Sequence, residues 1–400
     1  PWIPIPEAQA AVGPNGTLST YSAGGHLEMQ KNYYPLVDMS RFFAAMLVLI
    51  YHLGYSTWQP RSNGYFIHEG LYSIPQMSWA WFGYIGVQIF FVISGFVITH
   101  SAAKASLHQF VIGRITRLYP TLWICATITL LVCIAGDLYS GSELLRRYVG
   151  SLLLLPKAPW MEGVYWTLVL EIIFYALVGL MILSRRIHRI DLLAIFLTLY
   201  SGSAIIVASL FHATDIDWLS SLIGLARGKR QLLAWHGVFF AMGIYFYLAS
   251  VGRLRAINAL FAIATLVLCC LQIYVGAALP RAEALAEIGQ EEMAMRLPWI
   301  PIAAFLVFTA VIPLSIRYGA RIGQHVSVRM ASLLRLLGLM SYPIYLLHFT
   351  LGLVMMRRSA RQLAEWLARH PPAGDLFCSV NLSVGEIERP HLVEDVADII

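Results

Sequence analysis

The hydrophobic positions of the chain gather into runs of about 20 residues, separated by polar segments that contain most of the arginines. An α-helix of about 20 mostly apolar residues spans the hydrocarbon core of a bilayer. The runs lie at residues 37–57, 80–100, 116–136, 164–184, 191–211, 231–250, 256–277, 298–316 and 333–356. The pattern predicts an all-α polytopic membrane helix bundle with about nine to ten transmembrane helices. A shorter apolar stretch, 149–156, is too short to cross and is expected to be interfacial or re-entrant.

The composition agrees with a membrane protein and argues against a soluble domain or a nucleic-acid-binding protein. The 400 residues are 58% hydrophobic and 12% charged, whereas a soluble domain carries about 25% charged residues. The net charge of +6 comes from arginines between apolar runs, which is typical of topology determinants and does not indicate nucleic-acid binding. The five cysteines show no CxxC or Cys/His spacing, so we expect neither a structural disulfide nor a metal site.

The positions of the arginines also suggest an orientation. With the N-terminus in the cytoplasm, the short basic loops fall inside and an acidic loop with four glutamates (283–292) falls outside. We therefore expect a multi-pass protein of the inner (plasma) membrane with a cytoplasmic N-terminus. The expected divisions are a polar N-terminal segment (1–32), a membrane domain (33–356) and a polar C-terminal tail (357–400) that could contain a degenerate last span.

The first apolar run carries two ionisable groups, Arg41 and His52. Eleven residues correspond to three helical turns plus about 20°, so both side chains share one face, about 16 Å apart along the axis. Asp38, three residues before Arg41, can pair with it. The simpler alternatives are a snorkelling topology anchor for Arg41 and a hydrogen-bonded helix-end histidine for His52. Ionisable residues inside membrane helices are costly and usually functional, which favours a site.

Two later runs contain further polar groups. Glu171 lies in an otherwise uncharged run, where a central carboxylate costs about 2.5–3.5 kcal/mol on insertion scales and must face a partner or a watery cavity. The alternative is a structural ion pair with an arginine. Ser341, Tyr345 and His348 fall at i, i+4 and i+7 and form one polar stripe, for which helix–helix hydrogen bonding is the alternative.

Arg114 and Arg117 precede the third run and share a helix face at the cytoplasmic surface. Arginine pairs of this kind bind phosphate through charge-assisted, often bidentate hydrogen bonds. The alternative is that they only satisfy the positive-inside rule.

Five short blocks of this sequence occur in the same order in a known family. They are Arg41 and His52 with ten residues between them and Asp38 before them, GVQIFFVISGFVI (86–98), RITRLYP (114–120), WTLVLEIIFY (166–175) and SYPIYLLHF (341–349). Together they resemble the acyltransferase-3 family of integral membrane acyltransferases, which O-acylate bacterial glycans and other acceptors. Family members usually have about ten spans, and the last span is not evident here.

The resemblance implies transfer of an acyl group, most often acetyl, from acyl-CoA to a hydroxyl of a glycan such as exopolysaccharide or O-antigen. It implies catalytic roles for His52, Arg41 and Glu171 and donor binding by Arg114 and Arg117. His52 would act either as a general base or as an acyl carrier. Transfer from a thioester to an ester needs no bound cofactor and no metal. The remaining motif residues are expected to contact substrate or support the site: Asp38, Ser94, Trp166, Ser341, Tyr345 and His348.

Three other readings stay open at this point. A membrane transporter could use the intramembrane Arg, His and Glu as a proton or solute pathway, although no inverted repeat is evident. A scaffold protein would leave Glu171 and His52 unexplained. A histidine-dependent membrane O-acyltransferase of another family is the nearest enzyme alternative, and the Arg–His spacing of the first run favours acyltransferase-3. The sequence does not indicate the oligomeric state.

Overall fold

The computed structural model describes residues 35–58, 77–136, 138–156, 159–214, 233–278, 298–325 and 327–369. Its long helices are α2 (Pro35–Ile50), α4 (Ile85–Ala102), α5 (Leu107–Ala135), α6 (Gly141–Leu152), α7 (Trp166–Leu183), α8 (Ile190–Thr214), α10 (Gly237–Ser250), α11 (Ala256–Ile273), α14 (Trp299–His325), α15 (Val328–Leu347) and α16 (Thr350–Arg369). Short 3-10 or π turns lie at Tyr51–Tyr55, Ser56–Trp58, Ser78–Phe82, Gly163–Tyr165, Ile187–Arg189 and Tyr274–Ala278. The predicted N-terminal segment, 1–32, and the tail beyond residue 369 lie outside the described residues.

Eight of the described helices are long and apolar enough to cross a membrane. They cover 36–55, 78–102, 107–135, 163–183, 187–210, 256–276, 299–318 and 329–347. The prediction of an all-α polytopic membrane bundle is therefore confirmed. The predicted run 231–250 appears as the shorter α10, and the short stretch at 149–156 overlaps the end of α6.

The predicted helix boundaries fail at two places that matter for the site. Helix α5 begins at Leu107, nine residues before the predicted start of that run, because Ser106 and Gln109 form a capping box there. Arg114 and Arg117 are therefore inside the helix. The run 333–356, predicted as one helix, is divided at His348–Phe349 into α15 and α16. Apolar composition continues across this division, so hydropathy alone does not reveal it.

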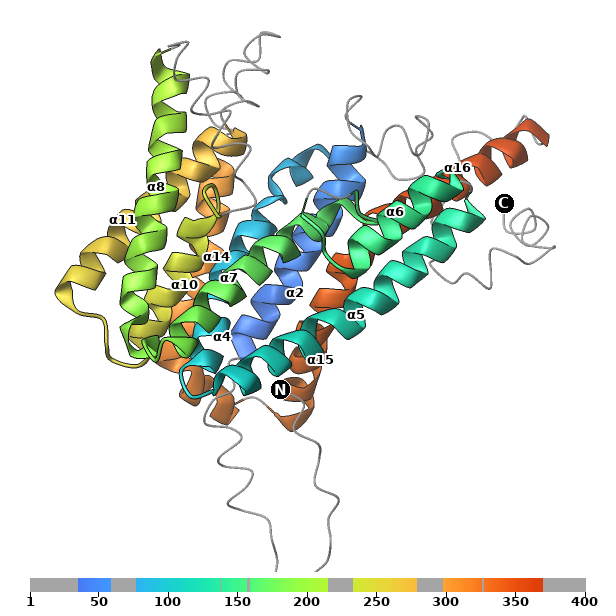
Figure 1. The fold of residues 1–400 in the computed structure, drawn as a ribbon. Helices are drawn as coiled ribbons and strands as arrows, with labels where there is room; N and C mark the ends of the chain where they lie inside the picture. Colours follow the sequence, from blue (N-terminus) through green and yellow to red (C-terminus); the bar gives the residue numbers. More distant parts are fainter. Residues whose placement is uncertain are drawn as a thin grey trace, which may run out of the picture.

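Helix α2 lies in the middle of the bundle (Figure 1), where it packs against α4, α14 and α15. Helices α8, α10 and α11 pack together on one side of it, while α5, α6 and α16 lie on the other. The first helix of the described chain thus has as neighbours both the next long helix and two helices from the last third of the sequence. This arrangement brings the sequence blocks predicted to form a site to the same region.

Helices α4 and α10 approach each other through two glycines. A Cβ atom on Gly95 would overlap the carbonyl oxygen of Phe240, and one on Gly243 would overlap the carbonyl oxygen of Val92. Because these obstacles are backbone atoms, a larger residue cannot be accommodated by a rotamer change. Small residues at such crossings allow membrane helices to pack closely.

We expect Gly243→Ala to lower the free energy of unfolding by about 1–3 kcal/mol, since the added methyl group must separate α4 from α10. Gly113→Ala is the matched control, because a Cβ at Gly113 of α5 meets nothing within 4 Å. Thermal unfolding of the two purified variants in detergent measures the difference. An unfolding temperature of Gly243→Ala equal to that of the control would contradict the close approach.

Candidate active site

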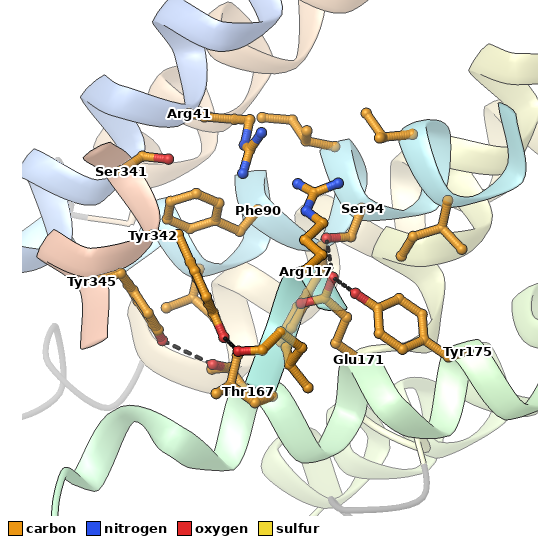
Figure 2. A pocket seen from close by; sticks show the side chains of 17 residues that line it. Arg41, Phe90, Ser94, Arg117, Thr167, Glu171, Tyr175, Ser341, Tyr342 and Tyr345 are labelled. Atoms are coloured by element: carbon orange, nitrogen blue, oxygen red, sulfur yellow. Dashed lines mark hydrogen bonds between the residues drawn. The ribbon is translucent and has the colours of Figure 1, made fainter. Parts of the chain in front are cut away.

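A cavity lies where five helices meet, and each of them contributes polar side chains to its wall (Figure 2). The polar lining consists of Arg41 from α2, Ser94 from α4, Arg117 from α5, Thr167, Glu171 and Tyr175 from α7, and Ser341, Tyr342 and Tyr345 from α15. Apolar residues such as Phe90 and Val87 complete it. All five sequence blocks contribute at least one charged or hydroxyl side chain to the wall, the first through Arg41.

The cationic part of the cavity is formed by Arg41 and Arg117, whose guanidinium groups lie near each other in Figure 2. Asp38 lies 3.9 Å from Arg41, between Oδ1 and Nη1, at the outer limit of an ion pair. The Asp38 side chain packs closely on α15, because a Cβ at Gly338 would lie 2.6 Å from the Asp38 Cβ. One carboxylate at this distance leaves the two guanidiniums able to receive an anion.

Glu171 is hydrogen-bonded inside the cavity by two hydroxyl groups. Tyr175 donates to its Oε1 at 2.6 Å and Ser94 donates to the same oxygen at 3.3 Å. Among the described residues, no lysine or arginine nitrogen comes within 4.0 Å of the Glu171 carboxylate. The alternative of a structural ion pair with an arginine is thus wrong for this part of the chain, and the carboxylate faces the cavity as predicted.

Arg114 lies in a different environment from Arg117. Only about 9% of its surface is exposed, and its guanidinium carbon lies 5.6 Å from the ring centre of Phe110 and 5.7 Å from that of Tyr175. Arg114 is absent from the cavity wall, whereas Arg117 lines it. The sequence spacing predicted the same role for both arginines, but only Arg117 faces the cavity. Arg114 packs on Tyr175, the tyrosine that donates a hydrogen bond to Glu171.

Three further predicted residues differ in their distance from the cavity. Tyr345 lines it and shares a 3.0 Å hydrogen bond with Thr167. Ser341 also lines it, and its hydroxyl donates to the carbonyl of Gly338 at 2.6 Å. Trp166 does not line the cavity and instead packs against the ring of His236, with ring centres 5.2 Å apart.

His52, which is half-buried, and His348, which is buried, form a pair next to this cavity. Nε2 of His348 lies 3.0 Å from Nδ1 of His52, and the ring centres are 5.0 Å apart. Neither histidine lines the cavity, but the ring of Tyr345, which does, lies 5.7 Å from that of His348. The pair therefore touches the cavity through Tyr345.

The hydrogen bonds of the pair fix its tautomers. Nδ1 of His52 lies 2.9 Å from the carbonyl oxygen of Val48, and Nδ1 of His348 lies 2.8 Å from that of Tyr345. A carbonyl only accepts, so both Nδ1 atoms carry hydrogen and the proton of His52 is shared with Nε2 of His348. The lone pair of neutral His52 is consequently on Nε2. His52 also lies in a π-helical turn, Tyr51–Tyr55, a feature frequent at functional sites.

Two features of the site were not predicted from the sequence, namely the role of Tyr175 and the contact between the two histidines. Tyr175 stands four residues after Glu171, so the i, i+4 rule could have identified it as a partner on the same helix face. The contact between His52 and His348 joins residues 296 positions apart, and no local pattern encodes such a pair.

The sequence profile of an acyltransferase domain family, acyltransferase-3, matches residues 34–370. The chain belongs to the acyltransferase-3 family. All five sequence blocks lie inside the matched range, which extends through α16. The match agrees with a polytopic membrane protein that carries an acyl-transfer site.

Three curated proteins are similar in sequence to parts of this acyltransferase-3 chain. An O-acetyl transferase of Shigella phage Sf6 is 27% identical over 213 residues, which is 47% of this chain and 59% of that protein. Nodulation protein 10 of Rhizobium leguminosarum is 26% identical, covering 50% of this chain and 60% of that protein. The peptidoglycan O-acetyltransferase OatA of Listeria monocytogenes is 29% identical over 30% of this chain and 16% of its own length.

These alignments are partial, since they span at most about three fifths of the relatives' lengths. No solved structure shows significant similarity to this acyltransferase-3 chain.

We expect Tyr175→Phe to lower the free energy of unfolding by about 1.5–3 kcal/mol, the range for a lost hydrogen bond to a charged group. Tyr119→Phe is the matched control on α5, because no hydrogen bond of its hydroxyl occurs among the described residues. The measurement is thermal unfolding in detergent. If both substitutions shift the unfolding temperature equally, the Tyr175 hydroxyl does not stabilise Glu171.

Proposed function

We propose that the protein transfers an acyl group, acetyl in the first instance, from acyl-CoA to a hydroxyl group of a glycan such as exopolysaccharide or O-antigen. The observation that carries this proposal is the pair of hydrogen-bonded histidines beside a cavity with two guanidinium groups. An oriented imidazole suits proton transfer from a hydroxyl, and paired arginines suit the phosphates of a CoA donor. Two of the three similar proteins are named as O-acetyltransferases, which agrees with this chemistry.

In the proposed reaction His52 is the general base. Its Nε2 takes the proton of the acceptor hydroxyl as the oxygen attacks the thioester carbonyl; the C–S bond then breaks, and the CoA thiolate leaves and receives that proton. The imidazolium formed on His52 donates more strongly from Nδ1 to His348, which orients the ring in the manner of the third member of a triad. An alternative within the same function is that Nε2 itself accepts the acyl group and passes it to the hydroxyl.

The donor is proposed to enter from the cytoplasmic side, with its phosphates at Arg117 and Arg41. Arg117 is exposed on α5 and lines the cavity, so an approaching anion meets it first. Arg114 serves the donor indirectly, by packing on Tyr175 and thereby fixing Glu171. Glu171 balances the positive charge of the cavity when no donor is bound.

This assignment implies an inner-membrane protein with a cytoplasmic N-terminus, because acyl-CoA is made in the cytoplasm and Arg41 and Arg117 must face it. The bilayer and a glycan or lipid-linked saccharide are then the remaining partners. Asp38, Ser94, Ser341 and Tyr345 support the site through the contacts described above.

We expect His52→Ala to abolish acyl transfer while the protein still inserts and folds, because Nε2 is the only proton acceptor that this mechanism uses. Acyl transfer to extracted glycan in proteoliposomes, with mass spectrometry of the product, measures activity, and thermal unfolding checks folding. His108→Ala, at the exposed start of α5, is the control and should transfer at the wild-type rate. A folded His52→Ala protein with wild-type transfer would remove His52 from the mechanism, whereas a wild-type protein without transfer would favour a transporter.

We expect Arg117→Ala to raise the KM for acyl-CoA about tenfold with little change in the acceptor KM, since a phosphate contact contributes about 1–2 kcal/mol. Arg117→Lys should restore the donor KM only in part, because the planar fork is lost. Donor titrations in proteoliposomes measure both values. A topology anchor would behave differently: lysine would replace arginine fully and the donor KM would not move.

A further inference from the structure

Glu162 is a fully buried carboxylic acid that belongs neither to the cavity wall nor to any of the five sequence blocks. It directly precedes the short turn Gly163–Tyr165 that leads into α7. Burying such a group is costly unless hydrogen bonds compensate. Its contacts therefore indicate what it does.

The hydrogen bonds of Glu162 lead to the division between α15 and α16. The backbone N–H of Thr350 donates to its Oε2 at 2.8 Å, and the hydroxyl of Thr129 donates to its Oε1 at 3.1 Å. Next to it, the Thr350 hydroxyl donates to the carbonyl of Met161 at 2.9 Å. Two bonds thus join residues 161–162 to the first residue of α16.

Thr350 is the first residue of α16, so its bond to Glu162 lies at the start of that helix. The first N–H groups of a helix have no partner inside it, and a carboxylate at the N-terminus satisfies them and interacts favourably with the helix dipole. Glu162 therefore supplies, from a distant part of the chain, the cap that allows α16 to start at Thr350. Without it the chain has no such reason to divide between Leu347 and Thr350.

The two residues at the division are both in contact with the proposed base. His348 lies 3.0 Å from His52, and the ring of Phe349 lies 5.1 Å from that of His52. A Cβ at Gly163, next to Glu162, would lie 3.6 Å from the Phe349 ring. Glu162 is therefore bonded to Thr350, which stands two positions after His348 in the chain.

We propose that Glu162 is a positioning residue for acyl transfer, which fixes the division between α15 and α16 and thereby holds the His348 imidazole against His52. The inference rests on the roles proposed above for the two histidines. Burial raises the pKa of the Glu162 carboxyl to about 8, while the hydrogen bonds from Thr350 and Thr129 lower it. Glutamine keeps a carbonyl oxygen that can accept from the Thr350 N–H, and its amide group can donate to the Thr129 hydroxyl, so it can preserve both contacts.

The first measurement compares Glu162→Ala with Glu162→Gln in full-length protein in proteoliposomes. We expect alanine to lower kcat about 10- to 100-fold, the effect of displacing a catalytic group by about 1 Å, with the KM for acyl-CoA changed less than about twofold. Glutamine should keep kcat within about threefold of wild type, since it preserves the cap. Glu365→Ala, an exposed carboxylate on the same α16, is the control and should leave kcat unchanged. Equal losses for alanine and glutamine would overturn the proposal.

The second measurement does not depend on activity. In protein labelled with ¹⁵N-histidine, the imidazole signals of His348 are assigned from the His348→Ala spectrum. Glu162→Ala should shift them and Glu162→Gln should not. An unshifted spectrum in Glu162→Ala overturns the positioning role, as does a shifted spectrum with unchanged kcat. If Glu162→Ala does not fold, Thr350→Val removes the neighbouring bond to Met161 and should shift the His348 signals. An unshifted spectrum then counts against the proposal.

A double-mutant cycle separates positioning from general destabilisation. Glu162→Ala should cost little further kcat once His348 is already alanine, because both changes remove the same support from His52. Additive losses would mean that Glu162 acts elsewhere. The proposed function fails separately, if the wild-type protein transfers no acyl group, and in that case the imidazole spectra still report whether Glu162 positions His348.

Discussion

The structure depends on one constraint: each ionisable group placed inside an apolar helix must find compensation there. A charged side chain at the centre of a membrane helix costs about 2.5–3.5 kcal/mol on insertion scales. Arg41, Arg117 and Glu171 come from three different helices and meet this cost together, in one cavity with hydroxyl donors in its wall. The bundle therefore converges where these groups meet, with α2 at its centre (Figure 1).

Helix α2 connects the two halves of the site, since it carries both Arg41 and His52. Their positions about three turns apart place the cation near one end of the helix and the imidazole deep within the bundle. The π turn that begins at Tyr51 and the hydrogen bond to Val48 then set the direction of the His52 ring. One helix thus sets the distance between the region proposed for donor phosphate and the proposed base.

Much of this could be predicted from the sequence, because it depends on local periodicity. Hydropathy identified the spans, and helical spacing placed Arg41 and His52 on one face. The same rule made Arg114 and Arg117 equivalent, yet about 60° of helix rotation puts one on the cavity and the other beneath Tyr175. The division of the last apolar run could not be predicted, because apolar composition continues across it and the Glu162 carboxyl that bonds the Thr350 N–H is 188 residues away.

The histidine pair lies outside the cavity wall, and this separation affects how an acyl-CoA thioester would have to bind. If phosphates bind Arg117 and Arg41, the acyl group must reach about 16 Å further along α2 to meet Nε2 of His52. The charged end of acyl-CoA can then stay near water while its long, flexible arm carries the thioester into the apolar interior. Tyr345 stands at the boundary, because it lines the cavity and also contacts His348. Separating the two ends in this way lets one membrane helix bind a polyanion and still keep its base away from bulk water, where hydrolysis would compete with transfer.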